Sequence, residues 1–187
     1  LGVVGKAQAF LLNRLGHLVY GYDVREVGGG EPYFILCNRP VKDVDVTFVC
    51  TPEWHAEEAL KMLLDAGVKG LYVIKSTVPP GTTIELMRKY GVHLCHNPEF
   101  LREKRAFEDV LKPNRIVIGE CCAEHGGILE NLYAPLDCPV YRTDPTTSEV
   151  IKVVTNSLRA VSISFWNELH LLCQKIGADV NVVAEAA

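Results

Sequence analysis

The strongest constraint on the fold of this chain is its alternation of short, almost continuously apolar runs with amphipathic stretches. The apolar runs predict strands at about residues 17–23, 45–50, 70–76, 92–96, 115–119 and 139–142. Between them, apolar residues recur at helical spacing at about residues 6–15, 54–66, 83–90 and 122–133. Strands that are apolar throughout are typical of sheets buried on both faces, so the chain predicts an α/β fold with a mostly parallel sheet.

After the last predicted strand the pattern changes to sustained helical spacing from residue 146 to residue 176. Such a helix is roughly 45 Å long, and its apolar residues surround most of its circumference, so we expect it to pack against another domain or subunit. Asp179 is the predicted N-cap of a further helix. The chain therefore divides into residues 1–143, a sheet domain, and residues 144–187, the beginning of a mostly helical domain.

Two capping boxes are predicted at helix starts. Thr82 with Glu85 would begin the helix at 83–90, and Thr146 with Glu149 would begin the long helix. The region between residues 24 and 43 is less informative, and Gly28 to Gly30 within it predict a turn or a flexible joint.

Composition excludes several classes of function. The chain has 187 residues, 48% of them hydrophobic, and a formal net charge of −4. Its basic residues are scattered, which disfavours nucleic-acid binding. Apolar runs are interrupted well before the ~20 residues of a membrane span, and no signal-peptide pattern is present. We therefore expect a cytoplasmic protein with no membrane or nucleic-acid partner.

The seven cysteines include no C-x-x-C pair, and we interpret most of them as small core residues. The most metal-like group is His93, Cys95 and His96 in the run VHLCH. Strand alternation turns Cys95 and His96 to opposite faces, and no second ligand pair follows. We therefore predict no metal site.

The opening residues LGVVG resemble the end of a G-x-G-x-x-G dinucleotide fingerprint. If Gly5 were the first glycine, Phe10 would occupy the third position and block close packing of helix on strand. If Gly2 and Gly5 are the second and third, Asp23 falls 18 residues later, close to the ~20 expected for a ribose-binding carboxylate. We therefore expect a Rossmann-like, doubly wound sheet whose first strand and first glycine precede this sequence. The alternative is an ordinary strand–helix turn.

Five stretches of the middle and end of the chain carry a family resemblance. They are FVCTP at 48–52, KSTVPPGTT at 75–83, NPEFLRE at 97–103, PNRIVIG at 113–119 and the helical run at 149–183. Together they closely resemble the UDP-glucose/GDP-mannose dehydrogenase family, over nearly the whole chain except residues 25–43. The resemblance implies NAD as cofactor, a nucleotide sugar such as UDP-glucose as substrate, and oxidation of the sugar C6 alcohol to a carboxylate.

The resemblance also implies roles for individual residues. Those assigned to the cofactor are Gly2 and Gly5 at the pyrophosphate, Asp23 at the ribose, and Thr51, Thr77 and Glu103. Those assigned to catalysis are Glu99 as acid/base, Lys152 and Asn156 at the reacting C6 oxygen, and Thr77 near a catalytic water. From the residues alone, each Thr is equally a turn or cap residue, and Lys152 could simply pair with Glu149 across one helical turn.

The chain also departs from the family pattern. The family nucleophile is a cysteine in a glycine-rich loop beyond the long helix, and none of the seven cysteines here lies in such a context; Cys173 lies within the helix. The segment between Asp23 and Asp45 is also shorter than usual.

Three hypotheses follow. The first is part of a nucleotide-sugar dehydrogenase that cannot complete the reaction alone and dimerises through the long helix. The second is a non-catalytic NAD or nucleotide-sugar binding protein. The third is a relative of β-hydroxyacid dehydrogenases, which lack NPEFLRE.

Overall fold

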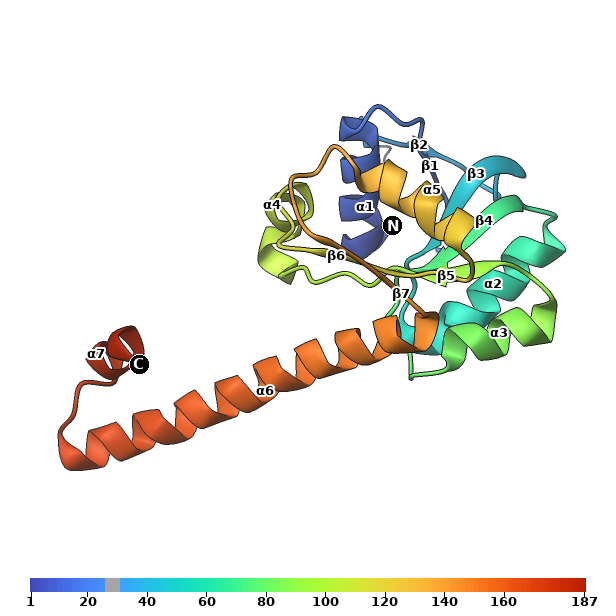
Figure 1. The fold of residues 1–187 in the computed structure, drawn as a ribbon. Helices are drawn as coiled ribbons and strands as arrows, with labels where there is room; N and C mark the ends of the chain where they lie inside the picture. Colours follow the sequence, from blue (N-terminus) through green and yellow to red (C-terminus); the bar gives the residue numbers. More distant parts are fainter. Residues whose placement is uncertain (26–30) are drawn as a thin grey trace. The chain divides into compact units, whose positions relative to one another are not determined.

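A computed structural model of the chain describes residues 1–25 and 31–187, and these residues form two compact units, Leu1–Lys152 and Val153–Ala187 (Figure 1). The turn or joint predicted at Gly28 to Gly30 lies outside the described residues.

The first unit is built on a five-stranded sheet. Its strands, in spatial order, are β3 (Asp43–Val49), β4 (Lys69–Ile74), β5 (Leu94–His96), β6 (Ile116–Gly119) and β7 (Val140–Thr143). All neighbouring pairs are parallel except β5 and β6, which are antiparallel and paired at His96 and Gly119. The short strands β1 (Tyr20–Gly21) and β2 (Ile35–Leu36) form a separate parallel pair. The predicted α/β fold with a mostly parallel sheet is confirmed.

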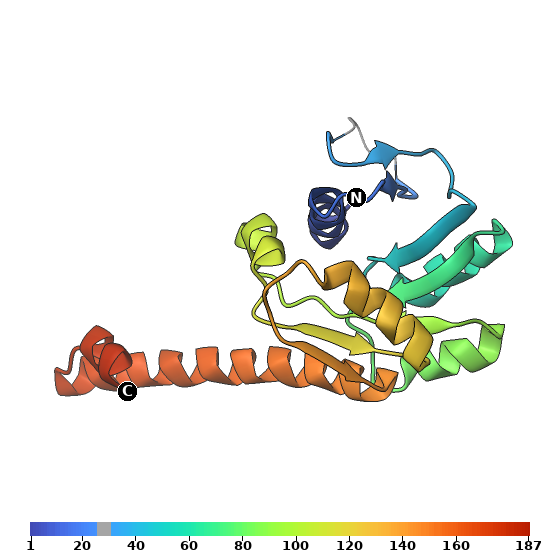
Figure 2. The same ribbon diagram turned by 45° about the horizontal axis from the view of Figure 1, so that its top comes forward.

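Helices cover both faces of this sheet. They are α1 (Val3–Arg14), α2 (Ala56–Asp65), α3 (Thr82–Tyr90), α4 (Ala106–Leu111) and α5 (Ala123–Tyr133), with 3₁₀ turns η1 (Glu53–His55) and η2 (Glu103–Arg105). Successive side chains of β4 point to opposite faces of the sheet, and each face has its own helices. Leu71 and Val73 pack with α1, α4 and α5. Tyr72 and Ile74 pack with α2 and α3. Figures 1 and 2 show the same division of helices between the two faces. A strand segment buried on both sides must be apolar at every position, as β4 is from Leu71 to Ile74.

Both predicted capping boxes are wrong. Helix α3 has Gly81 as N-cap with no side-chain cap of its own, and the Thr82 hydroxyl donates to the carbonyl of Pro79 at 2.7 Å. The long helix α6 (Pro145–Ile176) is capped instead by Asp144, whose carboxylate accepts from the amide of Thr147 at 2.9 Å. Glu149 turns away from its own helix start and binds the first turn of α3.

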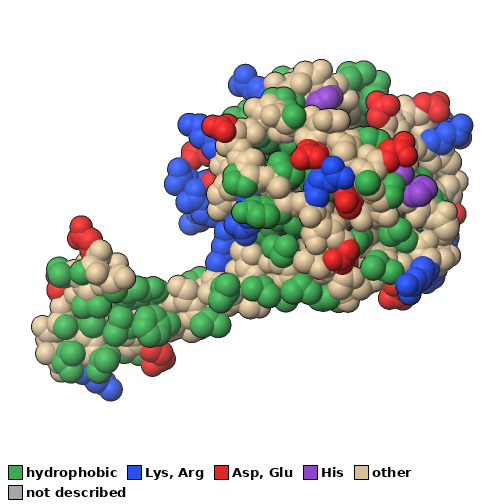
Figure 3. All heavy atoms as spheres, viewed as in Figure 1, with side chains coloured by type: hydrophobic (Ala, Val, Ile, Leu, Met, Phe, Trp, Pro, Cys, Tyr) green, Lys and Arg blue, Asp and Glu red, His purple; other side chains and the backbone are tan. Residues whose placement is uncertain are grey.

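The second unit consists of most of α6 together with the whole of α7 (Val180–Ala186). Asp179 caps α7, as predicted, by accepting a hydrogen bond from the amide of Asn181 at 2.9 Å. Large apolar side chains of this unit are exposed at Leu158, Val161, Ile163, Phe165, Leu171, Leu172, Ile176 and Val182. Figure 3 shows hydrophobic side chains over much of the surface of α6 and α7. Although α6 has 32 residues, no helix in the described part of the chain carries an apolar stretch sufficient to cross a membrane.

Candidate functional site

The candidate site lies where three parallel strands end side by side. The register pairs Val49 with Ile74 and Ile74 with His96, so the residues that follow β3, β4 and β5 emerge at one edge of the sheet. These residues are Thr51 after β3, Lys75 to Thr77 after β4, and Asn97 to Glu99 after β5. In open α/β sheets, ligands bind outside the carboxyl ends of the strands, which is this edge.

Glu99 and Lys152, which are 53 positions apart in the sequence, meet at this edge. The Lys152 ammonium donates to Glu99 Oε1 at 2.9 Å and to the Glu99 backbone carbonyl at 2.6 Å. Glu99 Oε2 accepts from the amide of Leu101 at 2.6 Å, so the carboxylate is held at both oxygens. The Lys152 side chain is only 5% exposed, and its Nζ lies 5.5 Å from the ring centre of Phe100.

The alternative pairing of Lys152 with Glu149 is wrong. Glu149 is fully buried and accepts three hydrogen bonds from the start of α3: from the Gly81 amide at 2.5 Å, the Thr83 amide at 2.8 Å and the Thr83 hydroxyl at 2.6 Å. These amides belong to the helix turn that has no intrahelical acceptors. Glu149, on α6, thus caps the start of α3, and Lys152 pairs with Glu99 instead of with Glu149.

His96 also anchors the beginning of α6. Its Nε2 lies 3.3 Å from the carbonyl of Ser76, so Nε2 carries the ring proton, and its Nδ1 lies 2.8 Å from the Ser148 hydroxyl, which donates. Burial lowers the pKa of His96 to about 4, so the imidazole is neutral at neutral pH. Gly119 allows the close approach, since a Cβ there would lie 2.7 Å from the Ser148 Cβ and 2.8 Å from the Pro145 Cα.

A buried polar network underlies the same edge and was not predicted from the sequence. The Lys75 ammonium donates to Asn97 Oδ1 at 2.9 Å, and the Tyr133 hydroxyl donates to the same oxygen at 2.6 Å. The Asn97 amide donates to the carbonyl of Val117 at 2.8 Å. Burial lowers the pKa of Lys75 to about 8. The available signal was a lysine and an asparagine directly after two apolar strands, at 75 and 97.

Cys50 lies at this edge between Val49 and Thr51. Desolvation raises the pKa of its thiol to about 11, so the thiol is protonated at neutral pH. A protonated thiol is a poor nucleophile.

The N-terminus of α1 fits a dinucleotide. Its N-cap, Gly2, provides no side-chain cap, and a Cβ built on Gly2 meets no described residue within 4 Å. A Cβ added at Gly5 would make ordinary van der Waals contact with Leu1 Cβ at 3.5 Å and Cys50 Cβ at 3.6 Å, which places this turn against the end of β3. The first amides of a helix have no intrahelical acceptor and favour an anion such as a pyrophosphate.

Asp23 lies beside this turn, with Oδ2 3.6 Å from the backbone nitrogen of Leu1 and Oδ1 accepting from the amide of Arg25 at 3.0 Å. Burial pushes the pKa of Asp23 upward, but the hydrogen bonds from Arg25 and its positive charge act against burial, and the net shift is downward. The carboxylate is therefore an anion, able to accept from ribose hydroxyls. The Thr51 hydroxyl is buried without a hydrogen-bond partner among the described residues, which fits a ligand at the same edge.

Three further residues predicted for the site, Thr77, Glu103 and Asn156, make none of the contacts described above. Thr77 is half-buried at the end of β4, and Glu103 is exposed at the start of η2. Within residues 1–25 and 31–187, no hydrogen bond or ion pair joins Glu103 to another predicted site residue. Asn156 is exposed one helical turn beyond Lys152, in the second unit.

Comparison with known proteins identifies the family. Residues 31–137 match the family model described as "UDP-glucose/GDP-mannose dehydrogenase family, NAD binding domain", and residues 146–187 match its central domain. The UDP-glucose 6-dehydrogenase of Rickettsia conorii is 41% identical over 162 residues, which cover 78% of this chain and 38% of that protein. This chain spans well under half of the length of the curated relatives it matches.

Solved structures agree with the sequence matches. The UDP-glucose dehydrogenase of Pyrobaculum islandicum superposes with a TM-score of 0.84 at 30% identity, covering 99% of this chain and 54% of that one. A ternary complex of GDP-mannose dehydrogenase from Pseudomonas aeruginosa gives 0.86 at 26% identity, with coverages of 99% and 54%. The expectation of NAD as cofactor is confirmed by the match to an NAD-binding domain. With more than half of its residues matched to that domain, the chain belongs to the UDP-glucose/GDP-mannose dehydrogenase family.

Proposed function

We propose that this chain carries the NAD-binding and proton-handling part of a nucleotide-sugar 6-dehydrogenase, in which the C6 alcohol of a nucleotide sugar such as UDP-glucose is oxidised to a carboxylate. The observation that carries the proposal is the Glu99–Lys152 pair, with 2.9 Å between Oε1 and Nζ, at the ligand-binding edge of the sheet. A protein that only binds a dinucleotide does not require a buried lysine at this edge.

Lys152 is suited to stabilise negative charge on a substrate oxygen. An ammonium has three N–H donors, and two of them go to the carbonyl and carboxylate of Glu99. The third donor is left for the C6 oxygen, where charge develops when the alcohol loses its proton. Burial of the lysine strengthens such an interaction because the local dielectric is low.

Glu99 is suited to move the proton. Its carboxylate is fixed by the Leu101 amide and by Lys152, and its side chain remains 18% exposed, so solvent or substrate can reach it. Bound NAD would supply the chemistry of hydride acceptance. Gly2 and Gly5 would receive the pyrophosphate, Asp23 the adenosine ribose, and Thr51, Thr77 and Glu103 would line the cofactor side. Asn156 would hydrogen-bond beside Lys152.

The proposal also covers the organisation of the protein. Residues 1–143 would form the NAD-binding domain and residues 144–187 the link to the rest of the enzyme. Exposed apolar residues on α6, among them Leu158 and Phe165, favour a homodimer formed through this helix. A cytoplasmic location and a role in polysaccharide biosynthesis belong to the same proposal.

Calorimetric titration of NAD into the chain tests the cofactor site. Asp23→Ala should weaken NAD binding by about 10- to 100-fold, because a hydrogen bond to a charged group is worth about 1.5–3 kcal/mol. Asp137→Ala, which changes an exposed carboxylate elsewhere on the first unit, should leave the affinity unchanged. Equal affinities for the two variants would refute the role of Asp23. A folded chain that binds no NAD at all would refute the proposed function.

A further inference from the structure

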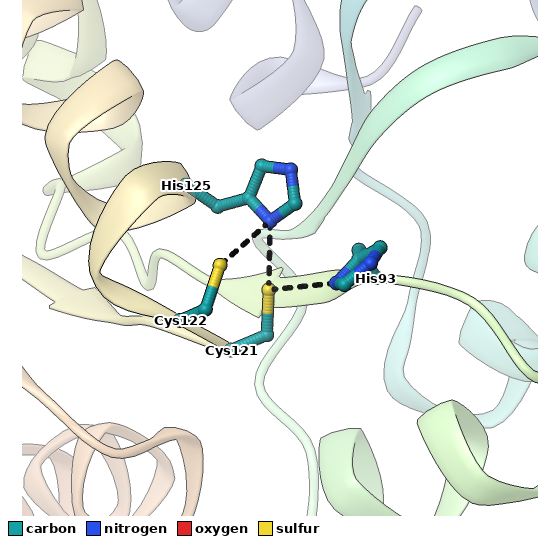
Figure 4. A group of neighbouring side chains, drawn as sticks. All are labelled: His93, Cys121, Cys122 and His125. Atoms are coloured by element: carbon teal, nitrogen blue, oxygen red, sulfur yellow. Dashed lines mark hydrogen bonds between the residues drawn. The ribbon is translucent and has the colours of Figure 1, made fainter.

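Four side chains that can bind a metal, two thiols and two imidazoles, meet at the opposite end of strand β5 from Glu99. His93 immediately precedes β5, Cys121 and Cys122 follow β6, and His125 lies in the first turn of α5. Figure 4 shows the two thiols and the two imidazole rings turned toward one another. Their ligand atoms all lie within 4.8 Å of one another.

The distances between the ligand atoms are close to those around a four-coordinate ion. His125 Nδ1 lies 3.2 Å from Cys121 Sγ and 3.1 Å from Cys122 Sγ, and His93 Nδ1 lies 3.8 Å from Cys121 Sγ. A tetrahedral Zn²⁺ with bonds of about 2.3 Å to sulfur and 2.0–2.1 Å to nitrogen holds adjacent ligand atoms about 3.3–3.8 Å apart. Small side-chain rotations would therefore complete the coordination shell.

The fold explains how these residues come together. Because β5 and β6 are antiparallel and pair at His96 and Gly119, the residues before β5 lie beside those that follow β6. Cys122 is the N-cap of α5, and His125 follows it by three positions, so both point to the same side of the helix start. The sequence motif is thus C-C-x-x-H together with a histidine 28 positions before Cys121.

The donor set selects the ion. Two thiolates and two neutral imidazoles neutralise a dication and provide the Cys₂His₂ set typical of zinc, whereas magnesium and calcium prefer oxygen ligands. Four protein ligands leave no open position, which is typical of structural rather than catalytic zinc. We propose that His93, Cys121, Cys122 and His125 bind a structural Zn²⁺ ion that joins β5 to β6 and α5.

The location gives the ion a structural purpose. Strands β5 and β6 share one register pair, His96 with Gly119, so the antiparallel junction in the middle of the sheet has few ladder hydrogen bonds. An ion held by residues from both sides of that junction would fasten it. The group that looked most metal-like in the sequence, His93 with Cys95 and His96, does not come together. His96 instead hydrogen-bonds to Ser148, and Cys95 lies in the core with its Sγ 3.8 Å from Cys121 Sγ.

Metal analysis of the purified chain tests the proposal. After incubation with Zn²⁺ and gel filtration, we expect about one zinc per chain by elemental mass spectrometry, and Co²⁺ in its place should give the intense visible bands of a tetrahedral thiolate complex. The double variant Cys121→Ser/Cys122→Ser and the single variant His125→Gln should lose the retained zinc. The matched controls, Cys37→Ser and His17→Ala, should keep it.

Stability and thiol state complete the test. Chelation should lower the melting temperature of the wild-type chain and of the controls but not that of His125→Gln, which is the informative variant if the double variant does not fold. The proposal is overturned if the wild type retains no zinc, if the variants retain as much, or if Co²⁺ gives a six-coordinate spectrum. It is also overturned if alkylation of the denatured chain shows Cys121 in a disulfide. NAD titration of the same variants separates this outcome from the proposed function, because in the described part of the chain no hydrogen bond or ion pair joins the four proposed zinc ligands to the residues assigned to the cofactor.

Discussion

Replacing Glu149 should destabilise the protein through a helix other than its own. The carboxylate is fully buried and accepts from the Gly81 amide, the Thr83 amide and the Thr83 hydroxyl at 2.5–2.8 Å. Glu149→Ala would leave the two buried donors of Thr83 and the partly buried Gly81 amide without an acceptor. Glu149→Gln retains one oxygen, which can serve both Thr83 donors, and places an NH₂ group against the Gly81 amide.

The magnitudes follow from the number of donors that lose their acceptor. Each buried unsatisfied donor costs about 1–3 kcal/mol, so loss of the two Thr83 bonds alone should make Glu149→Ala cost at least about 2 kcal/mol, and Glu149→Gln should cost about 1–3 kcal/mol. For a chain of this size, 1 kcal/mol corresponds to about 2–4 °C in melting temperature, so the alanine variant should melt at least about 4 °C lower.

Glu85→Gln is the matched control, because Glu85 is an exposed carboxylate in the first turn of the same helix α3. As a surface substitution it should change the free energy of unfolding by less than about 1 kcal/mol. Circular dichroism melts give the global effect, and hydrogen exchange gives the local one, since the amides of Gly81 and Thr83 should lose protection in the Glu149 variants alone. Equal melting temperatures for Glu149→Ala and Glu85→Gln would refute the reasoning.

Two further predictions concern the same junction. The pKa of His96 is about 4 in the folded chain, below the ordinary value of 6.5, so the unfolded chain binds more protons between these values. The free energy of unfolding should therefore fall as pH drops from 6.5 to 4, by about 3 kcal/mol in total, and His96→Asn should flatten this slope in urea titrations at several pH values. Gly119→Ala should cost about 1–3 kcal/mol, because its Cβ would collide with Ser148 and Pro145. Gly127→Ala, whose Cβ would meet only Arg142 Nη1 at 3.9 Å, should be neutral or stabilising in the same melts.

The sheet was predictable because a strand buried on both faces appears in the sequence as a run of consecutive apolar residues. Strand β4 is apolar at successive positions, and the predicted strand at 70–76 overlaps the observed Lys69–Ile74. The predicted strand at 17–23 shrinks to Tyr20–Gly21, since its hydrogen-bonded neighbour in the described chain is the two-residue strand β2. Helix α4 was missed because its six residues are too few to establish a helical period.

Contacts distant in sequence were not predictable from spacing. The two capping boxes follow a local rule, but Glu149 binds the start of helix α3, 66 positions away at Thr83, where two amides and one hydroxyl offer three hydrogen bonds. The metal ligands likewise depend on one antiparallel strand pair, which no periodicity indicates. The pairing of Glu99 with Lys152 was not predicted: the family resemblance gave each residue a separate catalytic role, and the residues alone allowed a local pair of Lys152 with Glu149 across one turn of the helix.

The beginning of α6 links the fold to the proposed chemistry. Ser148, Glu149 and Lys152 occupy neighbouring positions on successive turns, and each bonds a different element of the first unit: His96 at the end of β5, the start of α3, and Glu99. The contacts of Ser148 and Glu149 fix the rotation of the helix about its axis and its position along that axis. The Lys152–Glu99 contact therefore does not have to hold the helix in place. A loss of either anchor should therefore move the ammonium away from Glu99 before it unfolds the sheet, so that the position of Lys152 depends on residues that never touch a substrate.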